Sequence, residues 1–155
     1  MPTPARLLRA GREGFSLAEI LIVLVIMSLL AAIALPRIQG MVQVSSIQGA
    51  LNGVATDLTV ARMRAIRTAR RVTTTISADG KSYTIVVDPS GTPTTYKTVS
   101  LTTNYPGLDL APHGGTISFD SRGMTSGNTS TLTASRAGRS STLTISGVGR
   151  IYRGY

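Results

Sequence analysis

The sequence predicts an α+β protein in which a long N-terminal helix packs on a C-terminal, antiparallel, β-rich globular domain. Three observations predict this class. Residues 15–35 form an apolar run, residues 36–70 have the apolar spacing of an amphipathic helix, and residues 71–155 alternate with the period of strands. The chain of 155 residues is long enough for one domain and an additional helix, and it shows no internal repeat.

The first half of the expected helix is apolar enough to span a membrane. Of the 21 residues in the range 15–35, only Ser16, Glu19 and Ser28 are polar, and about 20 apolar residues suffice to cross a bilayer. Residues 1–14 carry three arginines and one glutamate, and positive charge stays on the cytoplasmic side. We therefore expect a transmembrane anchor, with the rest of the chain outside the cytoplasm.

An ordinary cleaved signal peptide is the alternative interpretation of this segment. Ala32-Ile33-Ala34 has the small-x-small pattern of a cleavage site. The apolar stretch, however, is longer than the roughly 7–15 residues of a signal sequence. It also contains Glu19, and an ionisable group at bilayer depth costs about 2.5–3.5 kcal/mol, which makes it a functional hypothesis by default.

The segment Gly14-Phe15-Ser16-Leu17-Ala18-Glu19, after a basic leader and before an apolar run, resembles the class III signal of type IV pilins and type II secretion pseudopilins. The resemblance implies that a prepilin peptidase removes residues 1–14 by cutting between Gly14 and Phe15. It also implies that the new N-terminus at Phe15 is methylated. Residues 15–35 would be kept as inner-membrane anchor and filament core.

Glu19 occupies the position of the glutamate that this family has at the fifth residue of the mature chain. A buried carboxylate is tolerated when it is paired with an opposite charge. We therefore expect Glu19 of one subunit to meet the free amine of Phe15 of its neighbour during assembly. The alternative is that Glu19 lies close enough to the membrane surface to reach water, without a partner.

Residues 36–70 are expected to continue the helix with one apolar stripe. Its members are spaced three and four apart: Val44, Ile47, Leu51, Val54, Leu58, Ala61 and Ala65. Pro36 is expected to loosen or break the helix, because proline removes one backbone donor and clashes with the preceding turn. Gly49 and Gly53 weaken a helix, and close packing against a neighbour or against the sheet would explain them.

Five arginines lie off the stripe, and we expect them to form a solvated face: Arg62, Arg64, Arg67, Arg70 and Arg71. From residue 72 the apolar pattern has period two. Residues 72–77 and 83–87 predict a hairpin with a type I′ turn at Asp79-Gly80. Further strands are expected at 94–101, 116–119, 131–134, 141–146 and within 147–152, with a turn at 88–91 and an irregular segment at 105–115.

A long amphipathic helix followed by a β-rich domain is the architecture of pilins. Residues 58–66 with Arg71-Val72-Thr73, Ile117-Ser118-Phe119 with Gly123, and Leu143-Thr144-Ile145-Ser146 with Gly149-Arg150 resemble blocks of the GspH/FimT minor pilins. The resemblance implies a structural subunit of a type II secretion pseudopilus or a type IV pilus. Its partners would be other pilins or pseudopilins, and its β-rich domain would lie in the periplasm.

DNA binding for DNA uptake is the alternative function, since the chain has a net charge of +9. Arginine supplies phosphate contacts and aromatic rings stack on bases. The arginines near the C-terminus, with Tyr152 and Tyr155 between and after them, are Arg136, Arg139, Arg150 and Arg153. Some members of the subfamily bind DNA through a Gly-Arg-x-Arg motif. Here Gly149-Arg150-Ile151-Tyr152-Arg153 has one residue more, which on a strand places the two arginines on opposite faces.

Two short motifs near the C-terminus have a plain structural interpretation. Gly149-Arg150 would alternatively be a structural turn, and Asn128-Thr129-Ser130 is taken as a chance glycosylation pattern.

The residues for metal binding or catalysis are few. The chain has no cysteine and one histidine, His113, so thiolate metal sites are excluded and a zinc site or a Ser-His-Asp triad is not expected. We expect no metal, no cofactor and no enzymatic activity.

Overall fold

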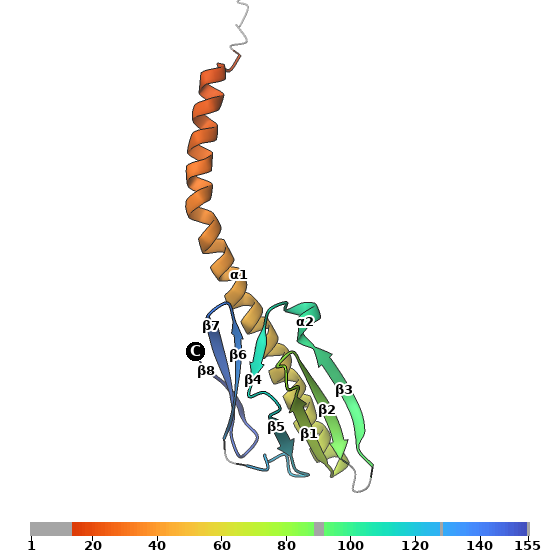
Figure 1. Cartoon of the computed structure of the whole chain (residues 1–155). Helices are drawn as coiled ribbons and strands as arrows, with labels where there is room; N and C mark the ends of the chain where they lie inside the picture. Colours follow the sequence, from red (N-terminus) through yellow and green to blue (C-terminus); the bar gives the residue numbers. More distant parts are fainter. Residues whose placement is uncertain (1–13, 89–91, 128, 155) are drawn as a thin grey trace, which may run out of the picture. The chain divides into compact units, whose positions relative to one another are not determined.

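The computed structural model describes residues 14–88, 92–127 and 129–154 (Figure 1). The leader up to residue 13, residues 89–91 of the expected second turn, Asn128 and Tyr155 lie outside the described residues. Two compact units meet at Gln39 and Gly40, and helix α1 (Leu17–Thr68) contributes residues to both.

The ends of α1 have clear local causes. At its start, the carbonyl oxygen of Ser16 accepts hydrogen bonds from the N–H groups of Glu19 and Ile20, at 3.0 and 3.2 Å. At its end, Ala69 adopts a positive φ of 50° and the N–H of Arg70 bonds back to the carbonyl of Ala65 at 3.2 Å. This is the left-handed closure that satisfies the last carbonyl groups of many helices.

α1 continues through Pro36, so the expected break in the helix is not observed. A proline inside a helix removes one N–H donor but leaves the hydrogen bonds on either side available. α1 is one helix over most of the two segments expected to be helical, residues 15–35 and 36–70.

Eight strands and a second, short helix follow α1. They are β1 (Arg71–Ile76), β2 (Ser82–Asp88), β3 (Thr94–Ser100), α2 (Leu101–Asn104), β4 (Asp109–Ala111), β5 (Thr116–Phe119), β6 (Ser130–Arg136), β7 (Arg139–Ile145) and β8 (Ile151–Gly154). The strands form two four-stranded sheets with the orders β3-β2-β1-β5 and β4-β6-β7-β8, and every pairing is antiparallel. The predicted α+β class is thereby confirmed.

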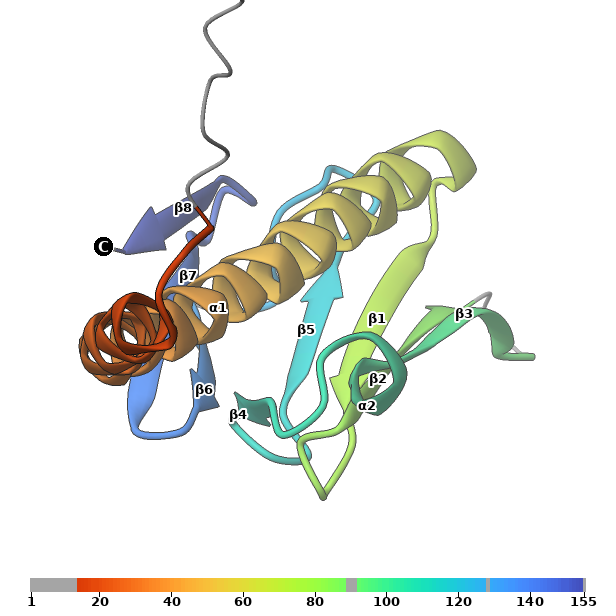
Figure 2. The ribbon, with the colours of Figure 1, turned by 90° about the horizontal axis from the view of Figure 1, so that it is seen from above.

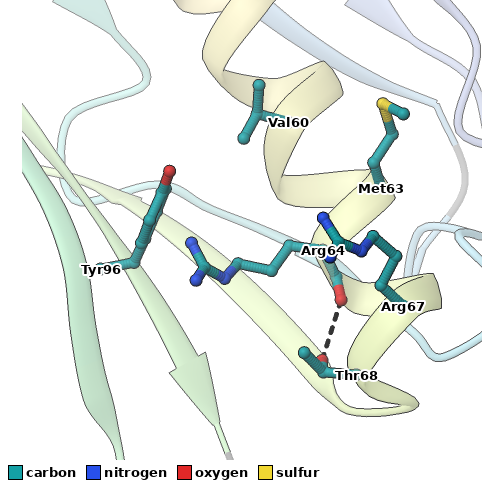
Figure 3. Close-up of a pocket in the computed structure, with 6 residues that line it drawn as sticks. All are labelled: Val60, Met63, Arg64, Arg67, Thr68 and Tyr96. Atoms are coloured by element: carbon teal, nitrogen blue, oxygen red, sulfur yellow. Dashed lines mark hydrogen bonds between the residues drawn. The ribbon is translucent and has the colours of Figure 1, made fainter.

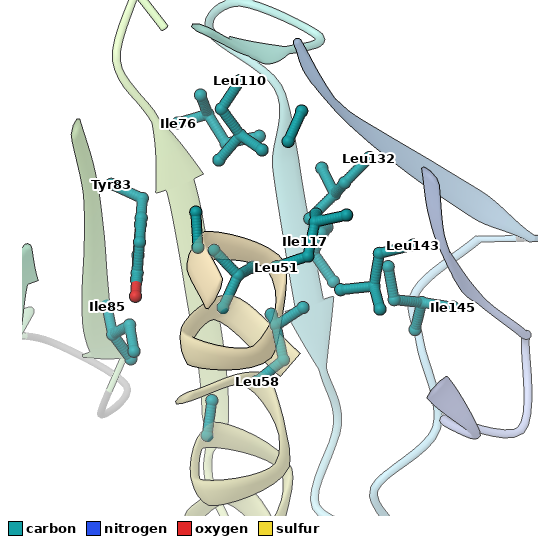
Figure 4. Close-up of a cluster of buried hydrophobic side chains, with 14 of the residues drawn as sticks. Leu51, Leu58, Ile76, Tyr83, Ile85, Leu110, Ile117, Leu132, Leu143 and Ile145 are labelled. Atoms are coloured by element: carbon teal, nitrogen blue, oxygen red, sulfur yellow. The ribbon is translucent and has the colours of Figure 1, made fainter. Parts of the chain in front are cut away.

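The core of the C-terminal unit lies between α1 and the two sheets (Figures 2 and 4). All members of the predicted helical stripe are buried except Val44, which is half-buried, and Ala50 joins them. Side chains from both sheets meet this stripe, including Ile85 and Phe119 from the first sheet and Leu132 and Leu143 from the second. One helix face therefore holds two sheets together.

The predicted type I′ turn at Asp79-Gly80 is wrong, although the hairpin that contains it is confirmed. That turn type needs positive φ at both central residues, and here only Gly80 has one, at 66°. The Asp79 carboxylate instead accepts bonds from the Ser77 hydroxyl and from the N–H of Lys81, which stabilises a longer loop. The two-residue turn with positive φ at both positions connects β6 and β7, at Ala137 (49°) and Gly138 (77°).

The segment expected to be irregular, 105–115, contains β4, and α2 directly precedes it. Leu108 and Leu110 are buried, and Leu110 pairs with Ala134 of β6. β4 was not predicted, because it is only three residues long and the proline and glycine residues around it indicated an irregular segment.

Of the two glycines expected to weaken the helix, Gly49 faces close packing, because a Cβ atom there would lie 3.2 Å from the Tyr105 ring. Gly53 has open space around it among the described residues, and nothing in the structure explains it.

Candidate functional site

The N-terminal unit presents an apolar helix with no buried side chain among its described residues, 14–39. Within this part of the chain, α1 is the one helix long and apolar enough to cross a membrane, with a mean hydropathy of 2.8 over its most apolar window. Fully burying one large aliphatic side chain is worth about 1.5–3 kcal/mol. A helix with this many exposed apolar side chains therefore requires lipid or other helices around it.

The residues of the expected processing and assembly site follow one another at the start of this helix. Among the described residues, no atom lies within 4 Å of the position that a Cβ atom on Gly14 would occupy, and the side chain of Phe15 is 78% exposed. Glu19 lies in the first turn of α1, where the helix dipole stabilises a negative charge. Glu19 is exposed, and none of the ion pairs among the described residues includes it.

The four C-terminal arginines do not form one cluster. Arg136 and Arg139 face each other across the β6–β7 turn, whereas Arg150 follows Gly149 in the turn before β8, at the other end of β7. Seven strand residues separate these two places, which corresponds to about 20 Å. Arg136 and Arg139 therefore lie apart from Arg150.

The arginines of the β6–β7 turn are directed toward α1. Arg136 donates a hydrogen bond from Nη1 to the hydroxyl of Ser46 at 2.9 Å and is half-buried. A Cβ atom on Gly40 would lie 3.0 Å from Nη2 of Arg139. Both side chains thus contact the helix of their own unit.

Arg150 and Arg153 belong to the edge of the second sheet. The Arg150 guanidinium lies 5.7 Å from the centre of the Tyr152 ring. Arg153 pairs in register with Leu143 and Tyr152 pairs with Thr144, so Tyr152 and Arg153 alternate between the two faces of β8. Arg150 and Arg153 are both exposed.

Arg62 was expected on a solvated face but is part of the packing between α1 and two turns. Its Nε donates to the carbonyl of Gly123 at 2.9 Å, and its Nη2 donates to the carbonyl of Val148 at 3.3 Å. Gly123 and Gly149 have positive φ values of 76° and 73° and are buried against it. The Gly149-Arg150 segment is therefore a structural turn, whatever else it does.

A polar cluster that the sequence did not indicate connects α1 to the first sheet. The hydroxyl of Tyr83 on β2 donates to Asp57 at 2.7 Å, and the Lys97 ammonium on β3 contacts both carboxylate oxygens of Asp57 at 2.7 Å. Burial, reinforced by the hydrogen bond to Asp57, raises the pKa of Tyr83 well above its usual range. The three residues are far apart in sequence, so no local pattern marks them.

His113 contacts the Asp109 carboxylate, with its Nε2 at 2.9 Å, and about half of its side chain is exposed. No group of three or more His, Asp or Glu residues suited to a metal ion occurs in the described ranges.

Family models match two segments of the chain. One, the type II transport protein GspH, matches residues 50–149, and another, the prokaryotic N-terminal methylation motif, matches residues 9–35. No curated protein matches the sequence. The first match spans well over half of the chain and confirms the resemblance to GspH-type subunits.

Solved structures with the same fold include the type IV minor pilin FimU of Pseudomonas aeruginosa, which is 20% identical to this chain. The similarity covers 72% of this chain and 90% of FimU with a TM-score of 0.60. The minor pseudopilin EpsH of the Vibrio cholerae type 2 secretion system is 14% identical, with 70% and 96% of the two chains covered and a TM-score of 0.57. These similarities confirm the pilin fold.

Proposed function

We propose a function from the premise that this chain belongs to the GspH family of type II transport proteins, whose model matches residues 50–149. The chain is a structural subunit, a minor pseudopilin or minor pilin, that assembles with other subunits of its kind into a filament. The observation that carries this proposal is the unburied apolar helix of residues 17–39, most of which lies within the methylation motif matched at residues 9–35 and which continues into a GspH-type unit.

The proposed processing site is the junction between Gly14 and Phe15. A prepilin peptidase would remove residues 1–14 there and methylate the new amine of Phe15. The exposed side chain of Phe15 supports access by an enzyme. The basic residues of the leader support a cytoplasmic location for this junction.

After processing, the chain would cross the inner membrane once, through residues 15–35. The C-terminal unit would then lie in the periplasm, because the positively charged leader stays on the other side. In the filament, neighbouring helices would replace lipid around the apolar side chains. Lipid in the membrane and neighbouring helices in the filament both remove the apolar side chains from contact with water.

Glu19 would direct assembly through its charge. The carboxylate enters the apolar phase with the helix, and a charge there is costly unless it is paired. The amine of Phe15 in the neighbouring subunit would supply the opposite charge. Among the described residues Glu19 has no ion-pair partner within its own chain, which leaves the carboxylate available for this contact.

The test is Glu19→Val in cells that assemble the filament. Processing at Gly14, methylation at Phe15 and membrane insertion are expected to remain, because the variant keeps the apolar helix and the cleavage junction. Incorporation into sheared filaments is expected to be lost. Mass spectrometry of the N-terminus and immunoblots of the filament fraction provide the two readouts.

A matched control is Ser28→Val in the same apolar helix. Among the described residues, the Ser28 hydroxyl bonds only to the carbonyl of Val25 in the preceding turn, at 2.8 Å, so its replacement should leave incorporation unchanged. Normal incorporation of the Glu19 variant would refute the charge-pairing role. If the Glu19 variant remains unprocessed, Glu19 is required for cleavage by the peptidase rather than for assembly.

A further inference from the structure

An open groove lies between the last turns of α1 and the edge strand β3 in the C-terminal unit (Figure 3). Its volume is about 540 Å³, and its lining residues are Val60, Met63, Arg64, Arg67, Thr68 and Tyr96. The apolar members are unusually accessible, since Val60, Met63 and Tyr96 are 37%, 58% and 43% exposed. The groove is thus an apolar surface in water.

β3 forms one side of this groove and is the edge of its sheet. Among the described residues it pairs with β2 and has no strand on its other side. Six of its seven residues are exposed and the seventh, Val99, is half-buried. An exposed edge offers a row of unpaired N–H and C=O groups to which an extended peptide can add as a further strand.

The charge of the groove is positive throughout. The guanidinium of Arg64 lies 3.7 Å from the centre of the Tyr96 ring, and Figure 3 shows it extending across the groove toward that ring. Arg67 follows three residues later on the same side of the helix, where two like charges repel each other. None of the six lining residues is acidic.

The ion pair of Lys97 on β3 with Asp57 on α1 does not neutralise the groove. It carries no net charge, and the carboxylate of Asp57 is already engaged by Lys97 and by the hydroxyl of Tyr83. Stacking on Tyr96 holds the Arg64 guanidinium in place, which reduces the entropy that it loses on binding a carboxylate. An occupant with negative charge would remove the repulsion and form charge-assisted hydrogen bonds.

We propose that this groove binds an extended, acidic segment of a partner protein, which adds to β3 as a fifth strand and places its carboxylates on Arg64 and Arg67. The strand edge supplies main-chain hydrogen bonds, Val60 and Met63 receive apolar side chains, and the two arginines select acidic ones. The groove belongs to the C-terminal unit, so the proposal is independent of the role of Glu19 in assembly.

The experiment uses the full chain in detergent micelles and a blocked peptide as long as β3 in which glutamate and valine alternate. Binding is measured by fluorescence anisotropy across a salt series, and hydrogen exchange is measured with and without peptide. We expect slower exchange in Thr94–Ser100 and unchanged exchange in Ile151–Gly154, the edge strand of the other sheet. Binding should weaken as salt increases.

Two double variants decide whether the arginines are responsible. Arg64→Gln with Arg67→Gln should raise the Kd of the peptide by about tenfold or more. Arg70→Gln with Arg153→Gln removes the same charge from exposed positions outside the groove and should leave the Kd within about twofold. Circular dichroism of each variant confirms that its fold is retained.

Three outcomes would overturn the proposal. One is equal binding of a lysine–valine peptide, which would remove the selection for acidic residues. Another is protection of β8 in place of β3. The third is a single-stranded oligonucleotide that binds the groove and excludes the acidic peptide, which would assign the stacked Arg64 and Tyr96 to nucleic acid.

Discussion

The guanidinium of Arg62 illustrates how one side chain can fix the orientation of turns that are distant in sequence. It donates to the carbonyl groups of Gly123 and Val148 from near the C-terminal end of α1. Hydrogen bonds from a charged donor contribute about 1.5–3 kcal/mol each when they are partly buried. The turn that follows β5 and the turn between β7 and β8 are therefore stabilised by a helix residue in addition to their own hydrogen bonds.

Arg62→Ala is expected to lower the free energy of unfolding by about 2–3 kcal/mol, because two carbonyl groups lose a charged donor. Arg67→Ala, at an exposed position of the same helix, should change it by less than about 0.5 kcal/mol. Urea denaturation of the full chain in micelles, followed by circular dichroism, measures both. Equal effects of the two substitutions would show that the bonds of Arg62 do not contribute to stability.

Tyr83 makes the stability of the first sheet dependent on pH in the alkaline range. Burial and the bond to Asp57 raise its pKa above the ordinary value of 10.0. The folded state therefore holds the phenol proton more tightly than the unfolded state. The stabilisation is complete below about pH 10 and is lost as the pH rises above it, because the unfolded chain then releases the proton first.

Tyr83→Phe removes this proton and should remove its part of the pH dependence. Between about pH 8 and pH 11, the unfolding midpoint of the unchanged chain is expected to fall more than that of the variant. At neutral pH the variant should be less stable by about 1 kcal/mol, since one hydrogen bond is lost. Parallel curves for the two proteins would contradict the assignment.

At the scale of the elements, the β6–β7 hairpin contains a residue that suits its turn poorly. Ala137 has a φ of 49° beside Gly138 at 77°. A left-handed conformation costs a residue with a Cβ atom about 1–2 kcal/mol, and asparagine and glycine tolerate it best at this position of a two-residue hairpin. The turn is thus held by the strand pairing on either side.

Ala137→Gly is therefore expected to stabilise the chain by up to about 1 kcal/mol, and Ala137→Asn should act in the same direction. Ala137→Val should destabilise it, because a branched side chain tolerates positive φ least. Thermal unfolding of the three variants gives the order. A loss of stability in the glycine variant would show that the Ala137 side chain contributes a contact that outweighs the strain.

The elements also show which parts of the fold are readable from sequence. The stripe from Ile47 to Ala65 and the alternation in β1 are long, regular patterns, and both predicted their elements correctly. The turn at Asp79-Gly80 was assigned wrongly because a dipeptide does not reveal the bonds that Ser77 and Lys81 make with Asp79. β4 was missed since three residues are too few to show a period.

At the scale of the whole molecule, the two units differ in how far they bury their apolar side chains. The C-terminal unit encloses its own core, with Leu58 and Leu143 at 1% and 0% exposure. In the N-terminal unit, Leu30 is 62% exposed. The sequence predicted a continuous apolar run up to Leu35 and an amphipathic stripe after it, whereas the two units divide between Gln39 and Gly40. It did not predict the arginine contacts, which depend on the placement of distant turns.

The difference between the units leads to a prediction for a chain that begins at Gly40. This shortened chain keeps every buried residue of the core, so it should remain in solution without detergent and unfold in one cooperative transition. The full chain in the same buffer should aggregate, because its apolar helix has no lipid or partner helix to cover it. Sedimentation velocity and thermal unfolding measure the two properties.

Two leucine substitutions test whether the units are energetically separate. In the full chain in micelles, Leu58→Ala should lower the free energy of unfolding of the C-terminal unit by about 2–5 kcal/mol, since it leaves a cavity between the helix and both sheets. Leu30→Ala should change it by less than about 0.5 kcal/mol. A substantial effect of Leu30→Ala would mean that the membrane-embedded half of α1 stabilises the C-terminal unit, and filament assembly would then be coupled to the folding of that unit.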